Sequence, residues 1–352
     1  MAQEAGKSYF SQFDEYNVRG KDINTSKYKE YTGEIPYIYG LDFYYVSGTY
    51  FPEQYKRKLK DNLVEVVKTQ WRENKAIPLF SWHLENPYVP NDFGEYIGSR
   101  FRYGQKDKPY PENHRYVIKE ILTKKGGEPC GFGTFKATEN NKPPYRNPSE
   151  WFEAQCMEVA YIINEFIDDS GKSIPIIFRL WHECEDTWMW WGSQAVSVED
   201  YKKFFIHTQT LIKKYAPKSQ IIWGYGTDRN WKTKEEFMLR YPGDRYVDII
   251  GYDDYQISNR NKEQESFEKA EIVASAAKKH GKIAALFETA NLNKQTSDNF
   301  LNCCLLPLLK AKDIGFGIIQ LWNVGEFDRE CQHVDRKDFL NNPKIIVKDC
   351  DE

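Results

Sequence analysis

Residues 174–178 read Ile-Pro-Ile-Ile-Phe, and residues 247–251 read Val-Asp-Ile-Ile-Gly. Short, nearly continuous apolar runs of this kind are typical of parallel strands that are buried on both faces. Each run is followed by a longer segment in which apolar residues recur at helical spacing, as in 198–214 and 262–280. The two stretches therefore predict strand–helix units of a parallel sheet.

The same alternation extends along the chain and predicts eight strands in all. They are expected at 8–13, 36–44, 76–82, 174–180, 220–225, 247–252, 283–287 and 316–322. Helices are expected between them at 52–74, 148–168, 198–214, 262–280 and 298–312, and Asn147 is the expected N-cap of the second. Eight such units favour an α/β fold closed into a (β/α)8 TIM barrel.

The first unit is the weakest part of this prediction, because 22–31 is a poor helix. An open, doubly wound sheet is therefore the alternative, but no Gly-rich phosphate loop follows any of the predicted strands. We see no internal repeat and no low-complexity linker, so residues 1–352 are expected to form a single catalytic domain.

One long segment, 86–146, interrupts the alternation and is rich in Pro, Gly, Tyr and charged residues. A loop of this length inside a compact domain is commonly functional. Because it follows the third strand, it is expected on the C-terminal face of the barrel, where it would form one wall of a cleft.

Composition excludes several classes of protein. The 49 basic and 52 acidic residues give a formal charge of -3, which provides no basic surface for nucleic acid. The seven Cys have neither a CxxC spacing nor an even count, so neither a metal site nor a disulfide framework is expected. No apolar run approaches the 18 residues or so of a membrane span, and the N-terminus lacks the apolar core of a signal peptide.

Aromatic residues make up 16% of the chain. The flat faces of Trp and Tyr suit the C–H-rich faces of sugar rings, although they also suit core packing and protein interfaces.

Ionisable side chains collect where the predicted strands end. The fourth strand ends in Arg179-Leu-Trp-His182-Glu183, and the seventh ends in Phe-Glu288-Thr. Carboxyl ends of barrel strands carry the catalytic residues of this fold, so Glu183 and Glu288 are expected to face each other across the barrel mouth. A retaining glycosidase needs two carboxyl groups roughly 5–5.5 Å apart.

The residues around these two glutamates resemble glycoside hydrolase family 26. The segment from Arg179 to Glu183, followed by Trp188-Met-Trp-Trp-Gly, resembles the family's acid/base motif, Arg-x-x-His-Glu with an aromatic Trp-Gly segment after it. Residues 81–87, Ser-Trp-His-Leu-Glu-Asn-Pro, resemble its Trp-His-x-x-Asn-Pro segment after the third strand.

Further matches follow in the family's order. Asp253 and Tyr255 match its Asp-x-Tyr after the sixth strand, Glu288 lies in a match to the nucleophile strand, and Trp322 with Asn323 matches the end of the eighth. The resemblance therefore covers most of the chain, and its specificity comes from the set of motifs rather than from any one of them.

The resemblance implies roles for these residues. Glu183 would be the general acid/base and Glu288 the nucleophile, with Tyr255 donating a hydrogen bond to the nucleophile. His83 and His182 would contact sugar hydroxyls, and Arg179 would pair with a carboxylate. The remaining substrate-binding positions are Asp253, Trp188, which would stack on a sugar ring, and Trp322, which would form the floor of the cleavage subsite.

Structural readings of several residues compete with these roles. Arg179 is equally well explained as a purely structural ion-pair partner and Asp253 as a cap of the following segment. His182 has the alternative of a satisfied core histidine. Trp190 and Trp191 are expected to pack the loop rather than to bind sugar. His182 and Glu183 do not form HExxH, so no zinc site and no cofactor are predicted.

These observations predict a retaining endo-acting glycoside hydrolase of a β-linked polysaccharide, with β-1,4-mannan as the expected substrate. The segment 184–187, Cys-Glu-Asp-Thr, departs from the family pattern and adds two acids beside the cleft, which leaves the sugar open. A β-1,3-xylanase, a mixed-linkage β-glucanase and a non-catalytic carbohydrate-binding barrel are the alternatives. A monomer that acts outside the cytoplasm, in an extracellular, periplasmic or cell-surface location, is expected, because a polysaccharide does not readily cross a membrane. The cytoplasm is the alternative location.

Overall fold

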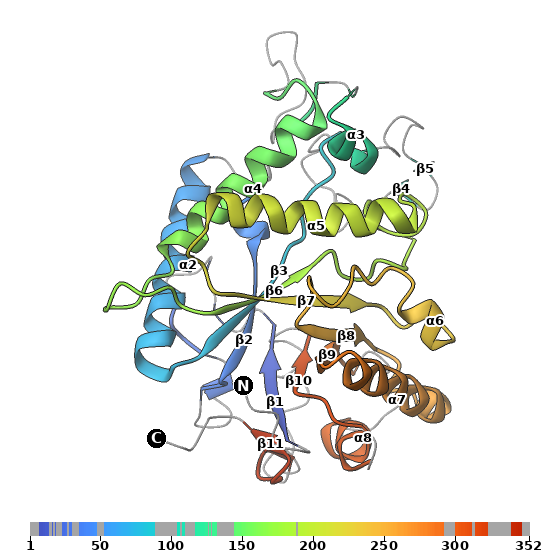
Figure 1. The fold of residues 1–352 in the computed structure, drawn as a ribbon. Coiled ribbons are helices and arrows are strands. Elements are labelled where there is room, and N and C mark those ends of the chain that lie inside the picture. The colour runs from blue at the N-terminus through green and yellow to red at the C-terminus, as the bar shows by residue number, and fades with distance from the viewer. Residues whose placement is uncertain are drawn as a thin grey trace.

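The computed structural model describes residues 7–13, 16, 18, 23–26, 28–29, 35–47, 53–88, 104–105, 108–109, 117–125, 127, 129–131, 144–187, 189–291, 300–311, 314–322 and 339–346. Within these ranges, one sheet has the strand order β11-β1-β10-β9-β8-β7-β6-β3-β2, and all of its pairings are parallel (Figure 1). The strands are β1 (Ser8–Gln12), β2 (Ile38–Asp42), β3 (Ile77–Ser81), β6 (Ile176–Leu180), β7 (Ile221–Thr227), β8 (Ile249–Asp253), β9 (Ile283–Thr289), β10 (Ile318–Leu321) and β11 (Ile345–Ile346).

The sheet closes on itself. β1 and β2 lie side by side, although no ladder of hydrogen bonds joins them in the described residues. All eight predicted strands are present, each within a few residues of its expected bounds. The predicted (β/α)8 barrel is therefore confirmed. The additional short strand β11 pairs with the N-terminal end of β1.

Helices surround the strands (Figure 1). They are α2 (Glu53–Asn74), α3 (Val117–Thr123), α4 (Pro148–Glu165), α5 (Val198–Tyr215), α6 (Lys234–Phe237), α7 (Glu263–Lys279) and α8 (Leu306–Lys310), with 3-10 turns at Phe43–Tyr45 and Arg260–Lys262. The predicted N-cap is also confirmed, because the Asn147 side chain accepts a hydrogen bond from the Glu150 backbone N–H at 2.9 Å.

Two predicted segments differ from the structure. The segment 86–146 is not simply a loop, since it contains α3 and a two-stranded antiparallel pair, β4 (Gly104–Gln105) and β5 (Lys108–Pro109). The wall that this segment was expected to form lies mostly outside the described residues. The helix expected at 298–312 is described from Phe300 onward, and it contains a π turn at Leu301–Leu305 before α8. Pro307 has no N–H to donate, which accounts for the interrupted hydrogen-bond pattern there.

Each barrel strand divides its side chains between two hydrophobic layers. On β6, Ile176 and Phe178 belong to the layer between the strands and the helices, whereas Ile177 belongs to the layer inside the barrel. This is the two-residue period of an extended strand. Arg179 follows Ile177 on the inner side, so the same alternation aims its side chain into the barrel.

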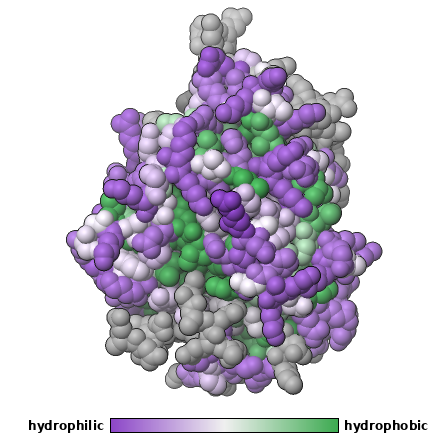
Figure 2. Space-filling view, viewed as in Figure 1, coloured by the Kyte–Doolittle hydropathy of each residue, from purple (hydrophilic) through white to green (hydrophobic). Residues whose placement is uncertain are grey.

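Most of the aromatic content is used in the outer layer. Buried Trp side chains occur at Trp82, Trp151, Trp181, Trp190, Trp191 and Trp231. The surface is different: the face in Figure 2 is mostly hydrophilic, with apolar patches between the polar side chains. In the described part of the chain, no helix has both the length and the apolar character needed to cross a membrane.

Gly251 leaves the space inside the barrel that Phe287 fills. A Cβ atom at Gly251 would lie 2.5 Å from Cδ2 of Phe287 and 2.6 Å from the backbone oxygen of Ala285. We expect Gly251→Ala to lower the free energy of unfolding by about 1–3 kcal/mol, because the packed interior has to shift. Gly315→Ala is the matched control, since a Cβ there would meet nothing within 4 Å. Urea unfolding of both variants checks this, and equal stabilities would contradict it.

Candidate active site

The guanidinium of Arg179 lies at the centre of the barrel mouth. Nη1 donates to Glu288 Oε1 at 2.6 Å, and Nη2 donates to Asp253. The side chain is completely buried and lies over the ring of Phe287, with 5.0 Å between the guanidinium carbon and the ring centroid. Burial opposes the charge of Arg179, but Asp253 and Glu288 outweigh it and raise the pKa of the guanidinium. One cation therefore joins the carboxyl ends of β6, β8 and β9.

Glu288 reaches this cation through a bulge in β9. Tyr252 of β8 is opposite Leu286, but the next residue, Asp253, is opposite Glu288, so Phe287 is skipped. In a regular strand, Phe287 and Glu288 would point to opposite faces. The extra residue re-aims the strand end, so both side chains contact Arg179 inside the barrel.

Glu183 stands where the chain leaves β6. Its φ of 52° and the φ of 47° at Trp181 lie in the left-handed region, which residues other than Gly rarely adopt. The Glu183 N–H donates to the Gly226 carbonyl at 3.1 Å, which ties this turn to β7. Backbone strain of this kind tends to occur at functional sites.

The environment of Glu183 favours its protonated form. The side chain is 8% exposed, and its buried Oε2 has no hydrogen-bond partner among the described residues. Burial, followed by the charges of Asp253 and Glu288, raises its pKa well above the ordinary value. Oxygen atoms of Glu183, Asp253 and Glu288 lie within 4.8 Å of one another. This separation fits a retaining pair, since inverting enzymes hold their carboxyl groups about 6.5–9.5 Å apart.

The same three carboxylates have a spacing that would suit a metal ion. Arg179 already donates to two of them and supplies the positive charge that such a cluster requires. We therefore assign no metal ligands here.

Tyr255 and Trp322 complete this side of the site. The Tyr255 hydroxyl donates to Glu288 Oε2 at 2.6 Å, so each oxygen of Glu288 accepts one hydrogen bond. Burial and the charge of Glu288 raise the pKa of Tyr255 well above its usual value, which keeps the proton on the phenol. Trp322 is half-buried and stacks on Phe13, with ring centroids 5.1 Å apart, and its ring meets that of Tyr255 edge to face.

His83 and His182 form a second group in the site, and the His83 ring lies beside Trp322, with centroids 6.4 Å apart. Their Nε2 atoms are 3.1 Å apart, and Nδ1 of His83 lies 2.5 Å from Asp42 Oδ2. Asp42 was not among the residues expected from the sequence. Only its position at the end of β2, beside the end of β3, could have indicated it.

Of Trp188, Trp190 and Trp191, the structure describes the last two. Trp188 lies outside the described residues, as does Asn323. Trp190 and Trp191 are buried and donate from Nε1 to the backbone oxygens of Leu84 and His182, both at 2.8 Å, so the expectation that they pack the loop is confirmed.

The unusual segment 184–187 adds less charge than expected. Cys184 is fully buried, and Glu185 turns toward Tyr225, whose hydroxyl lies 3.3 Å from its Oε1. Burial and the neighbouring Asp228 raise the pKa of Glu185 to about 8. Burial likewise raises the pKa of Asp228 to about 7. At neutral pH this side of the site therefore carries less negative charge than its acidic residues suggest.

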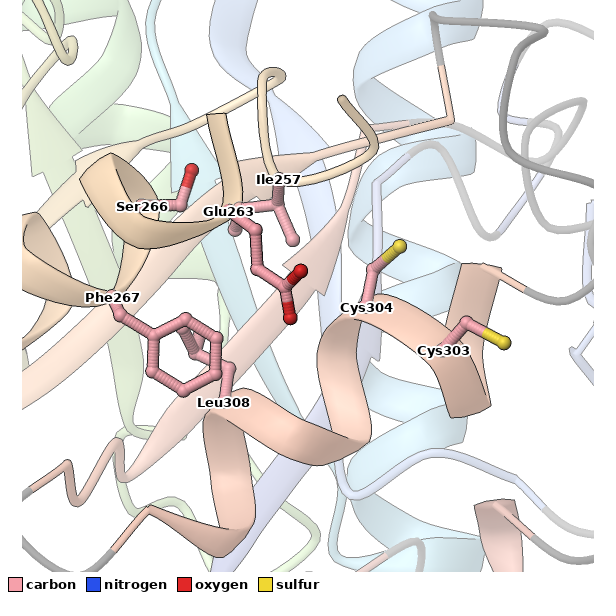
Figure 3. A pocket seen from close by; sticks show the side chains of 7 residues that line it. All are labelled: Ile257, Glu263, Ser266, Phe267, Cys303, Cys304 and Leu308. Atoms are coloured by element: carbon pink, nitrogen blue, oxygen red, sulfur yellow. The ribbon is translucent and has the colours of Figure 1, made fainter. Parts of the chain in front are cut away.

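A separate pocket of about 270 Å³ lies outside the barrel, between α7 and the turn that leads into α8 (Figure 3). No predicted site residue lines it. The lining residues are Ile257, Glu263, Ser266, Phe267, Cys303, Cys304 and Leu308.

The chain is similar to known proteins in sequence and in fold. Residues 143–300 match the family model of glycosyl hydrolase family 26. The chain is 25% identical over 230 residues to a mannan endo-1,4-beta-mannosidase of Bacillus subtilis strain 168. The protein is similar to the family 26 glycoside hydrolases. The resemblance read from the motifs is thereby confirmed.

The matches differ in how much they cover. The Bacillus subtilis alignment spans 64% of this chain and 51% of that protein. A mannan endo-1,4-beta-mannosidase of Bifidobacterium adolescentis is 28% identical over 124 residues, which is 34% of this chain and 12% of that protein. The chain thus spans about half or less of the length of these relatives.

Solved structures match over nearly the whole chain. GH26C from a Muricauda species has a TM-score of 0.75 at 22% identity, covering 97% of this chain and 87% of that one. A GH26 beta-mannanase from Bacteroides ovatus has a TM-score of 0.69 at 22% identity, covering 99% and 93%. These likenesses support the barrel fold.

We expect the buried Glu183 side chain to lower the free energy of unfolding by an amount that grows as pH rises. Folding raises the pKa of Glu183. The free energy of unfolding is therefore not reduced by Glu183 below the ordinary Glu pKa, and it falls as pH rises from there through the folded-state pKa. Glu183→Gln has no proton to lose, so we expect this variant to gain stability over the unmodified protein as pH rises. Urea unfolding over a pH series measures the difference.

Glu199→Gln, on the exposed side of α5, is the control and is expected to show no gain that grows with pH. A stability difference for Glu183→Gln that stays constant from acid to mildly alkaline pH would show that the pKa of Glu183 is not raised.

Proposed function

We propose that the protein is a retaining glycoside hydrolase that cleaves β-1,4-mannan within the polysaccharide chain. The observation that carries the proposal is the pair Glu183 and Glu288, whose nearest oxygens lie within 4.8 Å in opposite electrostatic surroundings. Glu288 accepts hydrogen bonds from a guanidinium and a phenol, whereas Glu183 has an unpartnered buried oxygen. This difference assigns the two roles.

In the first step, an ionised Glu288 oxygen attacks the anomeric carbon. The bond from that carbon to the leaving sugar oxygen breaks, and Glu183 gives its proton to this oxygen. The raised pKa of Glu183 keeps that proton available at neutral pH. In the second step, Glu183 takes a proton from water, which attacks the glycosyl ester and releases Glu288.

Arg179, Asp253 and Tyr255 act on the nucleophile rather than on the sugar in this proposal. Arg179 is fully buried between Asp253 and Glu288, so its charge stabilises the ionised nucleophile and sets its direction. Tyr255 holds the second oxygen. Because both donors are positioned before the reaction, little reorganisation is needed in the transition state.

The sugar contacts are assigned to residues on the open side of the site. Trp322 offers a half-buried aromatic face near His83 and Tyr255, which suits the apolar face of a sugar ring. Nδ1 of His182, which has no hydrogen-bond partner among the described residues, is the ring nitrogen proposed for a sugar hydroxyl, because Asp42 and His182 occupy the two ring nitrogens of His83. Trp188 is proposed as a second stacking surface on the basis of its motif alone.

Mannan is proposed because the relatives from Bacillus subtilis and Bifidobacterium adolescentis are mannan endo-1,4-beta-mannosidases. β-1,3-Xylan and mixed-linkage β-glucan are the alternatives, since the segment 184–187 departs from the family pattern. A non-catalytic sugar-binding barrel is disfavoured, because both glutamates are retained at a catalytic separation. We also propose that the protein is a monomer that acts outside the cytoplasm, where a polysaccharide substrate is accessible.

A substrate panel tests the proposal directly. We expect reducing sugars to be released from mannan and glucomannan, and little from β-1,3-xylan or barley β-glucan. Glu288→Gln should abolish release while sugar binding persists, because an amide cannot form the glycosyl ester. Release from another polysaccharide alone would overturn the mannan assignment. Normal turnover by Glu288→Gln would show that Glu288 is not the nucleophile.

Removal of the acid/base should produce a different pattern. We expect Glu183→Ala to lower kcat on mannan by about 10²–10⁴-fold, the usual contribution of general acid–base catalysis. On an activated aryl mannoside, azide should restore turnover to this variant, since azide needs no general base to attack the glycosyl ester. Proton NMR should show a β-glycosyl azide, and an α product would exclude the two-step retaining mechanism.

A further inference from the structure

Asp42, at the carboxyl end of β2, uses both of its carboxylate oxygens. Oδ1 accepts from the backbone N–H groups of Tyr44 at 2.7 Å and His83 at 3.1 Å. Oδ2 lies 2.5 Å from Nδ1 of His83. Asp42 is 3% exposed, so it reaches no sugar itself. Its contacts fix both the backbone and the ring of His83.

His83 in turn contacts His182. The two rings meet edge to face, with centroids 4.5 Å apart, and their Nε2 atoms are 3.1 Å apart. At this separation one nitrogen has to donate a proton and the other has to accept it. The protonation of His83 therefore decides which nitrogen of His182 carries a hydrogen.

The surrounding charges favour one of the two arrangements. Burial lowers the pKa of His83, but Asp42 and Glu288 outweigh both burial and Arg179, so the pKa is raised overall. Burial, Arg179 and His83 lower the pKa of His182 well below its usual value. A cationic His83 then donates from Nε2 to a neutral His182.

We propose that Asp42 is a positioning residue for glycoside hydrolysis, orienting His83 and thereby holding the proton of His182 on Nδ1. The inference rests on the proposed function, because His182 directly precedes the proposed acid/base Glu183. Nδ1 of His182 is buried and has no hydrogen-bond partner among the described residues. In this arrangement it is a hydrogen-bond donor, whereas loss of the charge on His83 would exchange the donor and the acceptor of the ring.

The direct test is ¹⁵N NMR of histidine-labelled protein, which distinguishes Nδ1–H, Nε2–H and the cation. The chain has six His, which single-His variants can assign. In the unmodified protein at neutral pH, we expect a cationic His83 and a neutral His182 with its proton on Nδ1. A proton on Nε2 of His182 would overturn the proposal.

Asp42→Asn removes the charge and keeps an oxygen for the backbone N–H groups of Tyr44 and His83. The amide N–H that this substitution introduces can only donate to Nδ1 of His83, so we expect His83 to lose its charge at a lower pH than in the unmodified protein and to keep its remaining proton on Nε2. The proton of His182 should then stay on Nδ1, and this variant tests the charge and orientation of His83. kcat/KM should fall about 10- to 100-fold, the range that is common when the carboxylate behind a metal-bound His is removed. The loss should be larger in mildly alkaline than in mildly acidic buffer. A uniform loss with unchanged NMR signals would mean that the role of Asp42 is structural.

Ser47→Ala is the matched control. It removes the hydrogen bond that Trp82 Nε1 donates to Ser47 Oγ at 2.8 Å, close to Asp42 in the chain, but leaves the contacts of Asp42 intact. We expect unchanged histidine signals and an unchanged pH profile. The same shift in both variants would contradict a specific role for Asp42.

His83→Asn serves if Asp42→Asn does not fold. Its amide can still donate to Asp42 but cannot reach His182, so the proton of His182 should no longer be held on Nδ1. A His182 that keeps its Nδ1–H signal in this variant would refute the proposal. The NMR experiments need no substrate. A protein that hydrolyses nothing would therefore overturn the proposed function, while the tautomer of His182 would still decide the role of Asp42.

Discussion

The site depends on the buried ion pairs that Arg179 forms with Asp253 and Glu288. Its buried guanidinium donates to Asp253 and Glu288, so it neutralises carboxylates from two other strands and draws three strand ends together. A buried charge that loses its partner commonly costs about 3–5 kcal/mol, which makes this arrangement sensitive to any change in its members. Glu183 lies beside these carboxylates but, in the described part of the chain, receives no hydrogen bond from Arg179. Arg179 thus pairs with Asp253 and Glu288 but not with Glu183, and this difference separates the proposed roles of the two glutamates.

Two local departures from regular geometry bring the proposed catalytic glutamates together. The bulge in β9 turns Glu288 inward beside Phe287, and a left-handed backbone at Glu183 redirects the chain after β6. The closed barrel supports both, because the Glu183 N–H bonds to β7 and Asp253 lies opposite Glu288 on β8. Backbone strain and irregular strand pairing of this kind persist where the surrounding structure stabilises them, and they are common at functional sites.

The histidine side of the site follows the same principle. Asp42 compensates the charge that we infer on His83, just as Arg179 compensates Glu288. Partly neutral acids at Glu185 and Asp228 limit the negative charge around Glu183. The aromatic residues divide between two tasks. Trp181, Trp190 and Trp191 pack the layer behind the site, and Trp322 remains half-buried at its opening. These features support the neutral polysaccharide that we propose as the substrate.

The sequence by itself determined the strand order along the chain, the barrel class and the positions of Glu183, Glu288 and Tyr255, because apolar periodicity and strand-end motifs are local properties. It did not reveal α3, the bulge in β9 or the contact between Asp42 and His83. These depend on how segments far apart in the chain pack: a bulge is defined only by the partner strand, and Asp42 meets His83 only because β2 and β3 are neighbours. The direction in which Glu288 points was likewise decided by the tertiary structure, since the bulge that turns it toward Arg179 exists only in the pairing of β9 with β8.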